Sequence, residues 1–261
     1  MSLRALPIAL VGSLALLGAS QAFPATGGAD AHAPNAAPLL APQRVSRVAA
    51  SVALPAARRA ARRPIVRVAP GASLALRERP GGRVFARLAG RTQFGSPTAL
   101  AVVSRRGRWL GLASSSRPNG RLAWVDRRAR GLRLRSTVVT LQADLSRHLL
   151  VLRRGDRVLR RVSVAVGKPG SPTPTGRFSV TDKLPGTRFG PYYGCCVLAL
   201  SGFQPNPPAG WKGGNRLAIH GTNIPGGVGR STSAGCLRAG DGDLAALMRL
   251  VPAGTTVTVR P

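Results

Sequence analysis

Acidic residues are scarce in this sequence. The chain of 261 residues has 8 Asp and Glu residues, and Glu78 is its only glutamate. A glycosidase that uses two carboxylates needs a pair facing one bond, and calcium or magnesium sites need clustered oxygen ligands. The aspartates are spread along the chain and offer no evident pair. The sequence therefore argues against a two-carboxylate glycosidase and against an oxygen-ligand metal site.

Cysteine and histidine are equally sparse, with three of each. None has the C-x-x-C or H-x-x-x-H spacing of zinc sites, so we expect no metal and no cofactor. Cys195 and Cys196 are adjacent, and a disulfide within such a pair strains its geometry. We therefore expect no bridge between them, and expect both to pack as small hydrophobic side chains. The alternative is that one of them is a redox partner of Cys236.

Lysine is nearly absent, yet the formal net charge is +31, carried almost wholly by arginine. Such a field attracts polyanions, among them nucleic acids, anionic lipid headgroups and phosphate-bearing wall polymers. The arginines are scattered through strand-like segments, and no zinc-finger spacing, RRM-like aromatic motif or basic region with heptads is present. We expect anionic wall polymers, and no nucleic acid, as partners.

Residues 1–22 have the pattern of a signal peptide. Arg4 supplies a positive charge, residues 5–17 are apolar, and small residues precede Ala22. The apolar run is short for a membrane span. We predict cleavage after Ala22 and export to the periplasm or cell wall, with an uncleaved membrane tether as the alternative. Residues 23–63, rich in Ala, Pro and Arg, are predicted to be a disordered tether.

Two short segments, 219–223 (IHGTN) and 233–238 (SAGCLR), carry the chemistry. A thiol is a strong nucleophile only as the thiolate, and a neighbouring imidazole can take its proton. Gly235, directly before the cysteine, lets backbone N–H groups approach a developing oxyanion. We therefore predict that Cys236 is a nucleophile and His220 its base. The alternative is a small buried thiol and an unrelated surface histidine.

The two segments resemble the active-site signature of the L,D-transpeptidases, the YkuD-type family that cross-links bacterial peptidoglycan. The family pattern reads His-Gly, a gap, then Ser-His-Gly-Cys-x-Arg, and here Ala234 replaces the second histidine. Residues 167–178 (GKPGSPTPTGRF) also resemble the family's Thr-Pro-x-Gly-x-Phe segment. The resemblance covers roughly residues 136–261.

The resemblance implies a cysteine acyltransferase without a cofactor. Cys236 would form a thioester with a peptidoglycan stem peptide and release terminal D-alanine. An amine of a neighbouring stem would then complete the cross-link. Carbapenem-type β-lactams are implied inhibitors, because their strained carbonyl would meet the same thiolate.

The resemblance also implies supporting roles around this pair. Gly235, Gly221 and Ser233 would support the oxyanion site, with the Gly221 carbonyl orienting the imidazole. The predicted substrate-binding residues are Arg238, Thr222, Asn223, Tyr193 and Trp211. Arg238 would either bind a substrate carboxylate or brace the loop, and Ser233 and Thr222 would either bond in the site or shape turns. Residues 184–214, rich in proline and glycine, are interpreted as a lid over the cleft.

Residues 64–135 read as short strands separated by turn signals such as Arg79-Pro-Gly-Gly. This spacing predicts a small β-barrel. The pattern is similar to the SH3-like modules that precede catalytic domains in exported wall enzymes. Trp109 and Trp124 are expected in its core, since large apolar rings are usually buried.

Residues 136–261 are predicted to form the β-rich catalytic domain. The expected strands are 137–143, 147–152, 158–166, 177–181, 196–200, 217–219 and 255–259. One helix is expected over 241–250, behind an Asp241 cap and ended by Pro252. The predicted fold class is thus mainly β: a small SH3-like β-barrel, then an L,D-transpeptidase catalytic domain with a short helix after the catalytic loop.

Other functions stay open at this point. Water as the acceptor would make the same site an L,D-carboxypeptidase. Ala234 and the high charge also fit a catalytically silent wall-binding protein, which would not need the thiol of Cys236. A cysteine peptidase of ordinary proteins would be expected to carry papain-type signatures, which are absent, and an export signal disfavours a nucleic-acid binder.

Overall fold

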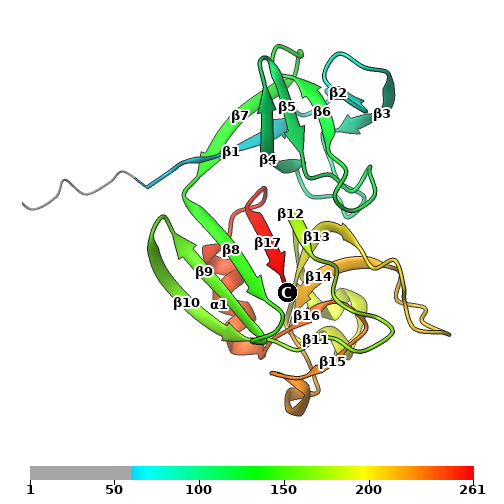
Figure 1. The fold of residues 1–261 in the computed structure, drawn as a ribbon, viewed down its shortest axis with the longest axis vertical. Coiled ribbons are helices and arrows are strands. Elements are labelled where there is room, and N and C mark those ends of the chain that lie inside the picture. The colour runs from blue at the N-terminus through cyan, green and yellow to red at the C-terminus, as the bar shows by residue number, and fades with distance from the viewer. Residues whose placement is uncertain (1–59) are drawn as a thin grey trace, which may run out of the picture. The chain divides into compact units, whose positions relative to one another are not determined.

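Strands dominate the computed structural model, which describes residues 60–261 (Figure 1). The mainly β fold class is therefore confirmed. The predicted signal peptide and nearly all of the predicted tether lie outside the described residues. The described residues belong to one compact unit. Within residues 60–261, no helix is both long and apolar enough to cross a lipid bilayer.

The first seven strands form one sheet with antiparallel pairings, in the order β3-β2-β6-β5-β4-β1-β7. They are β1 (Arg63–Val68), β2 (Ser73–Arg77), β3 (Val84–Ala89), β4 (Ala99–Arg106), β5 (Trp109–Leu112), β6 (Ala123–Asp126) and β7 (Leu132–Thr137). Buried aliphatic side chains such as Val66, Leu76 and Leu112 form its core. Strands β1 to β6 overlap the segments with strand-like sequence, 65–68, 74–76, 84–86, 100–103, 109–112 and 122–125, whereas β7 was not expected. The likeness to an SH3-like module stays a prediction.

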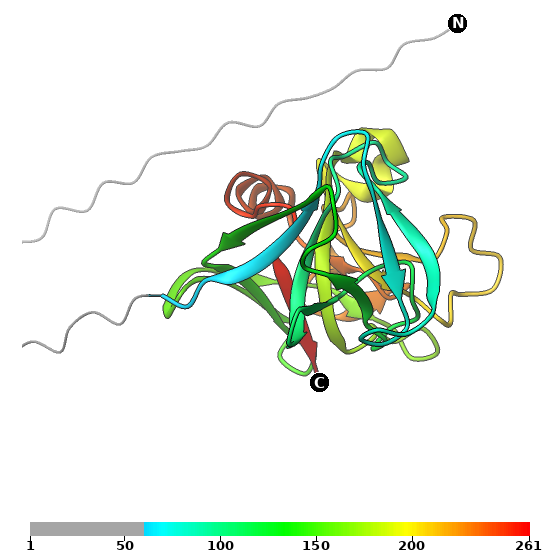
Figure 2. The same cartoon turned by 90° about the horizontal axis from the view of Figure 1, so that it is seen from above.

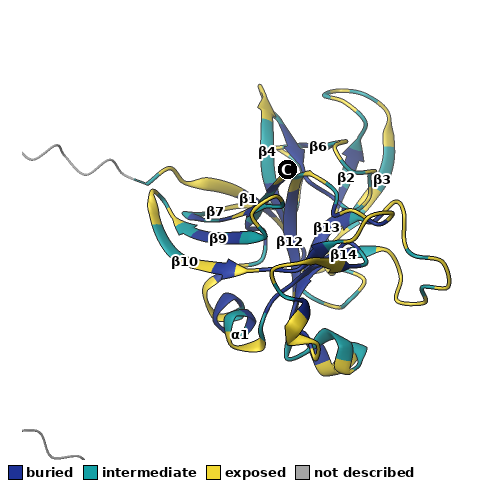
Figure 3. Ribbon diagram, turned by 60° about the horizontal axis from the view of Figure 1, so that its bottom comes forward, coloured by how far each residue is buried: buried dark blue, intermediate teal, exposed yellow. Residues whose placement is uncertain are grey.

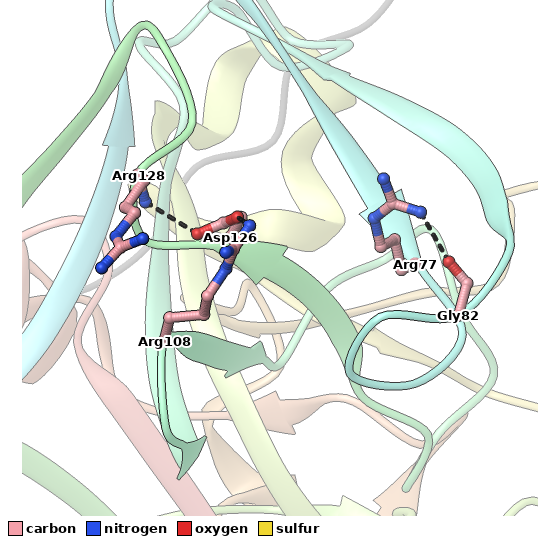
Figure 4. A network of polar contacts seen from close by, with 5 residues as sticks. All are labelled: Arg77, Gly82, Arg108, Asp126 and Arg128. Atoms are coloured by element: carbon pink, nitrogen blue, oxygen red, sulfur yellow. Dashed lines mark hydrogen bonds and ion pairs between the residues drawn. The ribbon is translucent and has the colours of Figure 1, made fainter.

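One tryptophan of this sheet, Trp109, packs against arginine side chains and lies outside the buried core. Trp124 is buried as expected, but the ring of Trp109 is partly exposed, with the guanidinium groups of Arg77 and Arg108 5.6 and 5.4 Å from its centroid. Figure 4 shows how both arginines are held. Arg77 donates to the carbonyl of Gly82, and Arg108 pairs with the carboxylate of Asp126.

The second sheet has eight strands in the order β10-β9-β8-β17-β12-β13-β14-β16. They are β8 (Val139–Asp144), β9 (Leu149–Arg154), β10 (Arg157–Ser163), β12 (Gly176–Pro185), β13 (Cys196–Phe203), β14 (Arg216–His220), β16 (Leu237–Arg238) and β17 (Thr256–Arg260). The short strands β11 (Val166–Gly167) and β15 (Ser231–Ser233) pair in parallel beside it. Three 3₁₀ turns complete the fold: η1 (Gly186–Phe189), η2 (Pro191–Tyr193) and η3 (Pro225–Gly227).

The centre of the second sheet is almost wholly buried, which makes it a rigid support for the strand ends. Figure 3 shows β12 and β13 mostly in dark blue. The single α-helix among the described residues, α1 (Asp241–Leu250), follows the 233–238 segment and contacts β13 and β14. Its Leu244 and Leu247 join the buried cluster around Phe178 and Ile219. The predicted short helix is confirmed.

Asp241, however, does not cap this helix. Gly240 is the N-cap residue, and no side chain caps the helix through a hydrogen bond. The carboxylate of Asp241 instead accepts hydrogen bonds from the backbone N–H groups of Cys195 and Thr222. The sequence rule places an Asp cap before the first turn, whereas here Asp241 is already the first helical residue and faces a neighbouring loop.

The predicted lid over residues 184–214 is not one continuous loop. Its middle, β13, is a buried strand at the centre of the sheet, because the apolar run 196–200 fits a core strand. Two loops remain, 186–195 before β13 and 204–215 after it. In Figure 2 the second loop extends away from the sheet between β13 and β14.

Candidate active site

Parallel pairing of β14 and β16 places His220 and Cys236 at nearby positions in the sheet. Ile219 lies opposite Leu237, and His220 lies opposite Arg238. Cys236 directly precedes β16, so by the same register it lies beside Ala218. Side chains two residues apart on a strand share one face of the sheet. The two predicted catalytic side chains, separated by 15 residues of chain, therefore share one face at one end of the sheet.

The imidazole of His220 is fixed in one orientation. It is 1% exposed, and its Nδ1 lies 2.6 Å from the carbonyl oxygen of Gly221. Since a carbonyl only accepts, Nδ1 donates, and Nε2 is left as the basic nitrogen. Burial lowers the pKa of His220 to about 4, the Gly221 bond opposes this, and the charge of Arg238 adds to it. The predicted orienting role of the Gly221 carbonyl fits this geometry.

Cys236 is a free thiol in a partly buried residue. Its Sγ lies 3.8 Å from the carbonyl oxygen of Arg216. Burial raises the pKa of the thiol to about 11, while a backbone hydrogen bond from Ala218 and the charge of Arg238 lower it in part. Burial thus disfavours both charged forms, and the resting pair is a neutral thiol and a neutral imidazole.

Aromatic rings cover the imidazole. The ring centroid of Tyr193 lies 4.8 Å and that of Tyr192 5.7 Å from His220. Trp211, from the loop 204–215, packs edge-on against Tyr192. The structure thus brings the predicted residues Tyr193 and Trp211 to the site and adds Tyr192. The adjacency of the two tyrosines was the sequence signal for this third ring.

The loop before Cys236 is closed by Ser233. Its hydroxyl donates to the carbonyl of Cys236 at 2.6 Å and accepts from the N–H of Gly235 at 3.0 Å. Ser233 therefore shapes the turn, which is one of its two expected roles. The Gly235 N–H is engaged within the loop. Gly235 has a φ of +117°, a conformation that favours glycine.

Gln204 connects two segments of the site, although no sequence motif pointed to it. Its amide nitrogen lies within 3.2 Å of the carbonyl oxygens of Ser171, Pro172 and Ala234, and its amide oxygen accepts from the N–H of Asn206. The side chain thus ties the segment 167–178 to the loop that carries Cys236. A lone glutamine in a loop gives no motif, so no sequence signal was available.

Arg238 is buried, with 3% of its surface exposed. Its Nη2 donates to the hydroxyl of Thr232 at 2.7 Å, and its guanidinium lies 5.5 Å from the centroid of Tyr192. These contacts fit the second of the two predicted roles of Arg238, which is to hold the loop in place rather than to bind a substrate carboxylate. Its Nε has no hydrogen-bond partner among the described residues.

The segment after His220 is held by Asp241. Oδ1 of Asp241 accepts from the N–H of Thr222 at 3.1 Å, and Oδ2 from the N–H of Cys195 at 3.0 Å. The Thr222 hydroxyl accepts from the N–H of Ile224, so Thr222 shapes a turn. Asn223 is exposed beside it. Asp241 therefore fixes both the His220 loop and the tyrosine loop.

The expectation of no bridge between the adjacent cysteines was wrong, because a disulfide joins Cys195 and Cys196. Both nevertheless pack against the buried cluster around Phe178, as expected. The prediction rested on the strain of a disulfide between adjacent residues, which in a strand also point to opposite faces. In the structure β13 begins only at Cys196, and the N–H of Cys195 bonds to Asp241 instead of to a neighbouring strand. Strand alternation therefore does not apply to Cys195. Cys236 is not bonded to either of them.

A small apolar pocket of about 60 Å³ lies beside the catalytic pair. Leu184, Val197 and Ala218 form a buried cluster in its wall, and Cys236 and Tyr193 pack against that cluster. Phe94, from the first sheet's loop between β3 and β4, also lines the pocket. Its carbonyl accepts from Arg188, and the neighbouring Thr92 bonds to Asp182. No motif in the sequence indicates that the first sheet reaches this pocket.

Comparison with known proteins finds matches to L,D-transpeptidases. Residues 139–259 match the family model of the L,D-transpeptidase catalytic domain, YkuD. Two proteins, each named "Putative L,D-transpeptidase YkuD", are 36% identical over 112 residues in Bacillus subtilis and 32% identical over 123 residues in Bacillus licheniformis. A solved L,D-transpeptidase from Mycobacterium smegmatis has 20% identity and a TM-score of 0.39, covering 63% of this chain and 90% of that chain.

The matches to the family model and to the two Bacillus proteins each cover less than half of this chain. The Bacillus alignments cover 42% and 46% of this chain, and 58% and 65% of the relatives. The chain thus spans less than two thirds of their length. Both His220 and Cys236 fall within the matched range. Residues 139–259 of this chain are thus similar to the YkuD family of L,D-transpeptidase catalytic domains.

Proposed function

We propose that this protein is an exported peptidoglycan L,D-transpeptidase that acts through a cysteine thioester. The observation that carries the proposal is the placement of His220 at the end of β14 and of Cys236 directly before the paired strand β16, with Nδ1 of His220 held by Gly221. This leaves Nε2 as the base for the thiol. The match of residues 139–259 to the family model supports the substrate class.

The first half-reaction forms the thioester. Nε2 of His220 takes the proton of the Cys236 thiol as the sulfur attacks the carbonyl carbon of the third residue of a tetrapeptide stem. The amide bond to terminal D-alanine breaks, and the imidazolium returns the proton to the leaving amine. Backbone N–H groups near Cys236 would stabilise the oxyanion, and losing one such donor typically costs about 10²–10³ in rate.

The second half-reaction transfers the acyl group. The amine of a neighbouring stem attacks the thioester carbon, His220 takes a proton from it, and the Cys236 thiol is restored. Because burial disfavours both charged forms, we expect the proton to move as the thiol attacks a substrate carbonyl. The buried site also disfavours a free thiolate, which would react with other electrophiles.

The remaining parts of the chain fit the same proposal. Residues 1–22 would direct export, and 23–63 would tether the folded part within the periplasm or wall. The first sheet would serve as an SH3-like module beside the catalytic domain. The aromatic rings of Tyr192, Tyr193 and Trp211 would exclude water from the thioester, which favours an amine acceptor over hydrolysis.

The test is intact-protein mass spectrometry of the mature chain with a carbapenem, comparing wild type with Cys236→Ala. We expect one covalent adduct on the wild type and none on the variant. A folded wild type without an adduct would point instead to a silent wall-binding protein. His220→Ala should keep the fold and slow adduct formation at least a hundredfold, as for loss of a general base.

A second assay identifies the acceptor. A tetrapeptide stem is incubated with the enzyme in H₂¹⁸O, with and without an excess of a stem that carries a free amine. Cross-linked dimer with little ¹⁸O-labelled tripeptide supports transpeptidation. Labelled tripeptide as the main product at every amine concentration would make the protein an L,D-carboxypeptidase.

A further inference from the structure

A second cavity lies in the first sheet, separate from the catalytic pair. Its volume is about 610 Å³, within the range of small-molecule sites. All of its lining residues come from the segments 67–73, 89–91, 97–98 and 133–135. None belongs to the second sheet, so a ligand bound there would not need the active site.

Four arginines line this cavity: Arg67, Arg91, Arg133 and Arg135. All four are exposed, and no Asp or Glu is among the lining residues. Within residues 60–261, the ion pairs between arginines and carboxylates involve other arginines. The cavity therefore concentrates positive charge that the described part of the protein does not neutralise.

The strand register forces two of these charges together. β1 and β7 pair so that Arg67 lies directly opposite Arg133, with Arg135 two residues further along the same face of β7. Like charges directly opposite each other destabilise a sheet. Along β7, the two arginines are roughly 7 Å apart, from a rise of about 3.4 Å per residue. This arrangement costs stability unless an anion lies between the guanidinium groups.

Thr98, in the wall of the same cavity, has a buried hydroxyl group without a partner among the described residues. The residue is 2% exposed. A buried hydroxyl without a partner is costly, and such groups in native proteins usually have a structural or functional reason. Its backbone N–H and C=O are both bonded, to Gly90 and Val68.

We propose that this cavity binds the phosphate groups of an anionic polymer. The planar guanidinium of arginine suits the bidentate recognition of phosphate. The volume equals that of on the order of twenty water molecules, which exceeds the need of one free phosphate ion. The spacing of the arginines along β7 instead fits successive anionic groups of one chain. The first sheet would hold the protein on such a polymer while the catalytic site acts elsewhere.

The test compares two double variants that remove the same charge. Arg67→Gln with Arg133→Gln alters the cavity. Arg154→Gln with Arg157→Gln alters a second opposed arginine pair, at the end of β9 and β10, which does not line the cavity. Binding of short-chain inorganic polyphosphate is measured by calorimetry at several salt concentrations around 0.15 M.

We expect the control double variant to bind like wild type and the cavity variant to bind at least tenfold more weakly. The slope of log K against log salt should fall by about two only in the cavity variant. Equal weakening in both variants would show binding by net charge alone and would overturn the proposal. If monomeric phosphate binds with the same affinity per phosphate group as polyphosphate, the proposal of a polymeric ligand is wrong. If polyaspartate binds with the same affinity as polyphosphate, the proposal that the cavity selects phosphate is wrong.

Thermal unfolding provides a readout that a merely structural role would not give. Without ligand, both double variants should melt higher than wild type, because each relieves a repulsion between opposed arginines. Polyphosphate should then raise the melting temperature of wild type and control, and not that of the cavity variant. If the cavity double variant does not fold, Arg133→Gln alone serves with Arg157→Gln as its control. A cavity variant that still gains stability from polyphosphate would contradict the proposal.

Discussion

The amide of Gln204 occupies the space that a side chain at position 235 would need. An ideal Cβ atom on Gly235 would lie 2.0 Å from Nε2 of Gln204. The φ of +117° at Gly235 independently favours glycine. The glycine before the nucleophile is thus required by its backbone conformation and by a contact with a residue 31 positions earlier in the chain.

Gln204→Leu should impair the catalytic loop. The carbonyl groups of Ser171, Pro172 and Ala234 would lose their common donor, which we expect to cost about 1–3 kcal/mol in the free energy of unfolding. We also expect carbapenem acylation to slow tenfold or more, because Cys236 follows the released loop. Denaturant unfolding and acylation rates measure the two effects. Gln142→Leu, on the exposed face of β8, is the control. If the Gln204 variant folds and is acylated at the wild-type rate, the contacts of Gln204 contribute to stability and not to the reactivity of Cys236.

Stability should fall in acid because of His220. In the folded protein burial lowers its pKa to about 4, while in the unfolded chain the imidazole takes a proton near pH 6.5. The unfolded state therefore binds more protons between these values. The free energy of unfolding should drop by about 3 kcal/mol as the pH falls from 6.5 to 4.

His220→Gln should remove this part of the pH dependence, whatever its effect at neutral pH. His148→Gln, which changes a histidine bonded to Ser231 outside the site, is the matched control. Urea unfolding at several pH values gives the slopes. An unchanged acid slope in the His220 variant would show that this imidazole is not buried in its neutral form.

At high pH the thiol of Cys236 should have the opposite effect. Burial raises its pKa to about 11, so the unfolded chain loses the proton first as the pH rises above about 9. Stability should therefore decline between pH 9 and 11, and Cys236→Ser should decline less over this range. Alkylation of the free enzyme by iodoacetamide should be slow at pH 8. Rapid alkylation would indicate a resting thiolate.

Asp241→Asn should loosen the two loops that meet at the active site. An amide offers one oxygen where the carboxylate offers two, so the N–H of either Cys195 or Thr222 loses its acceptor. We expect a loss of about 1–3 kcal/mol in the free energy of unfolding. Asp243→Asn removes the same charge from the same first turn of α1, but breaks only an exposed pair with Arg160, and should cost less than about 1 kcal/mol. Equal losses of unfolding free energy in the two variants would show that the effect comes from the charge at the helix N-terminus and not from the bonds to the two loops.

Phe94→Ala tests whether the first sheet contributes to substrate binding, given the proposed function. The ring lines the pocket beside Cys236, and losing about 50 Å² of apolar contact would cost roughly 1.3 kcal/mol, or about tenfold in KM. Turnover at saturating stem peptide should change less than KM. Phe85→Ala, whose ring packs against the first sheet's own core, is the control. A lower kcat with unchanged KM would contradict a binding role.

Local sequence determined most of the secondary structure and pointed to the candidate catalytic pair. Alternating apolar residues encode strands because side chains alternate across a sheet, and the helix 241–250 follows from its apolar spacing. The segments 219–223 and 233–238 also predict His220 and Cys236 as the reactive residues, since that chemistry depends on residue types within a few positions. These signals all act over short stretches of chain.

Only the tertiary structure decided which distant residues support that pair. Gln204 meets Ala234, Asp241 meets Cys195, and Phe94 reaches the pocket beside Cys236, each across 30 or more positions. The opposition of Arg67 and Arg133 likewise depends on the pairing of β1 with β7. Such contacts follow from strand order and register, which the periodicity of one segment does not encode. The chain therefore specifies its reactive groups locally, while their surroundings arise from the way the strands pair.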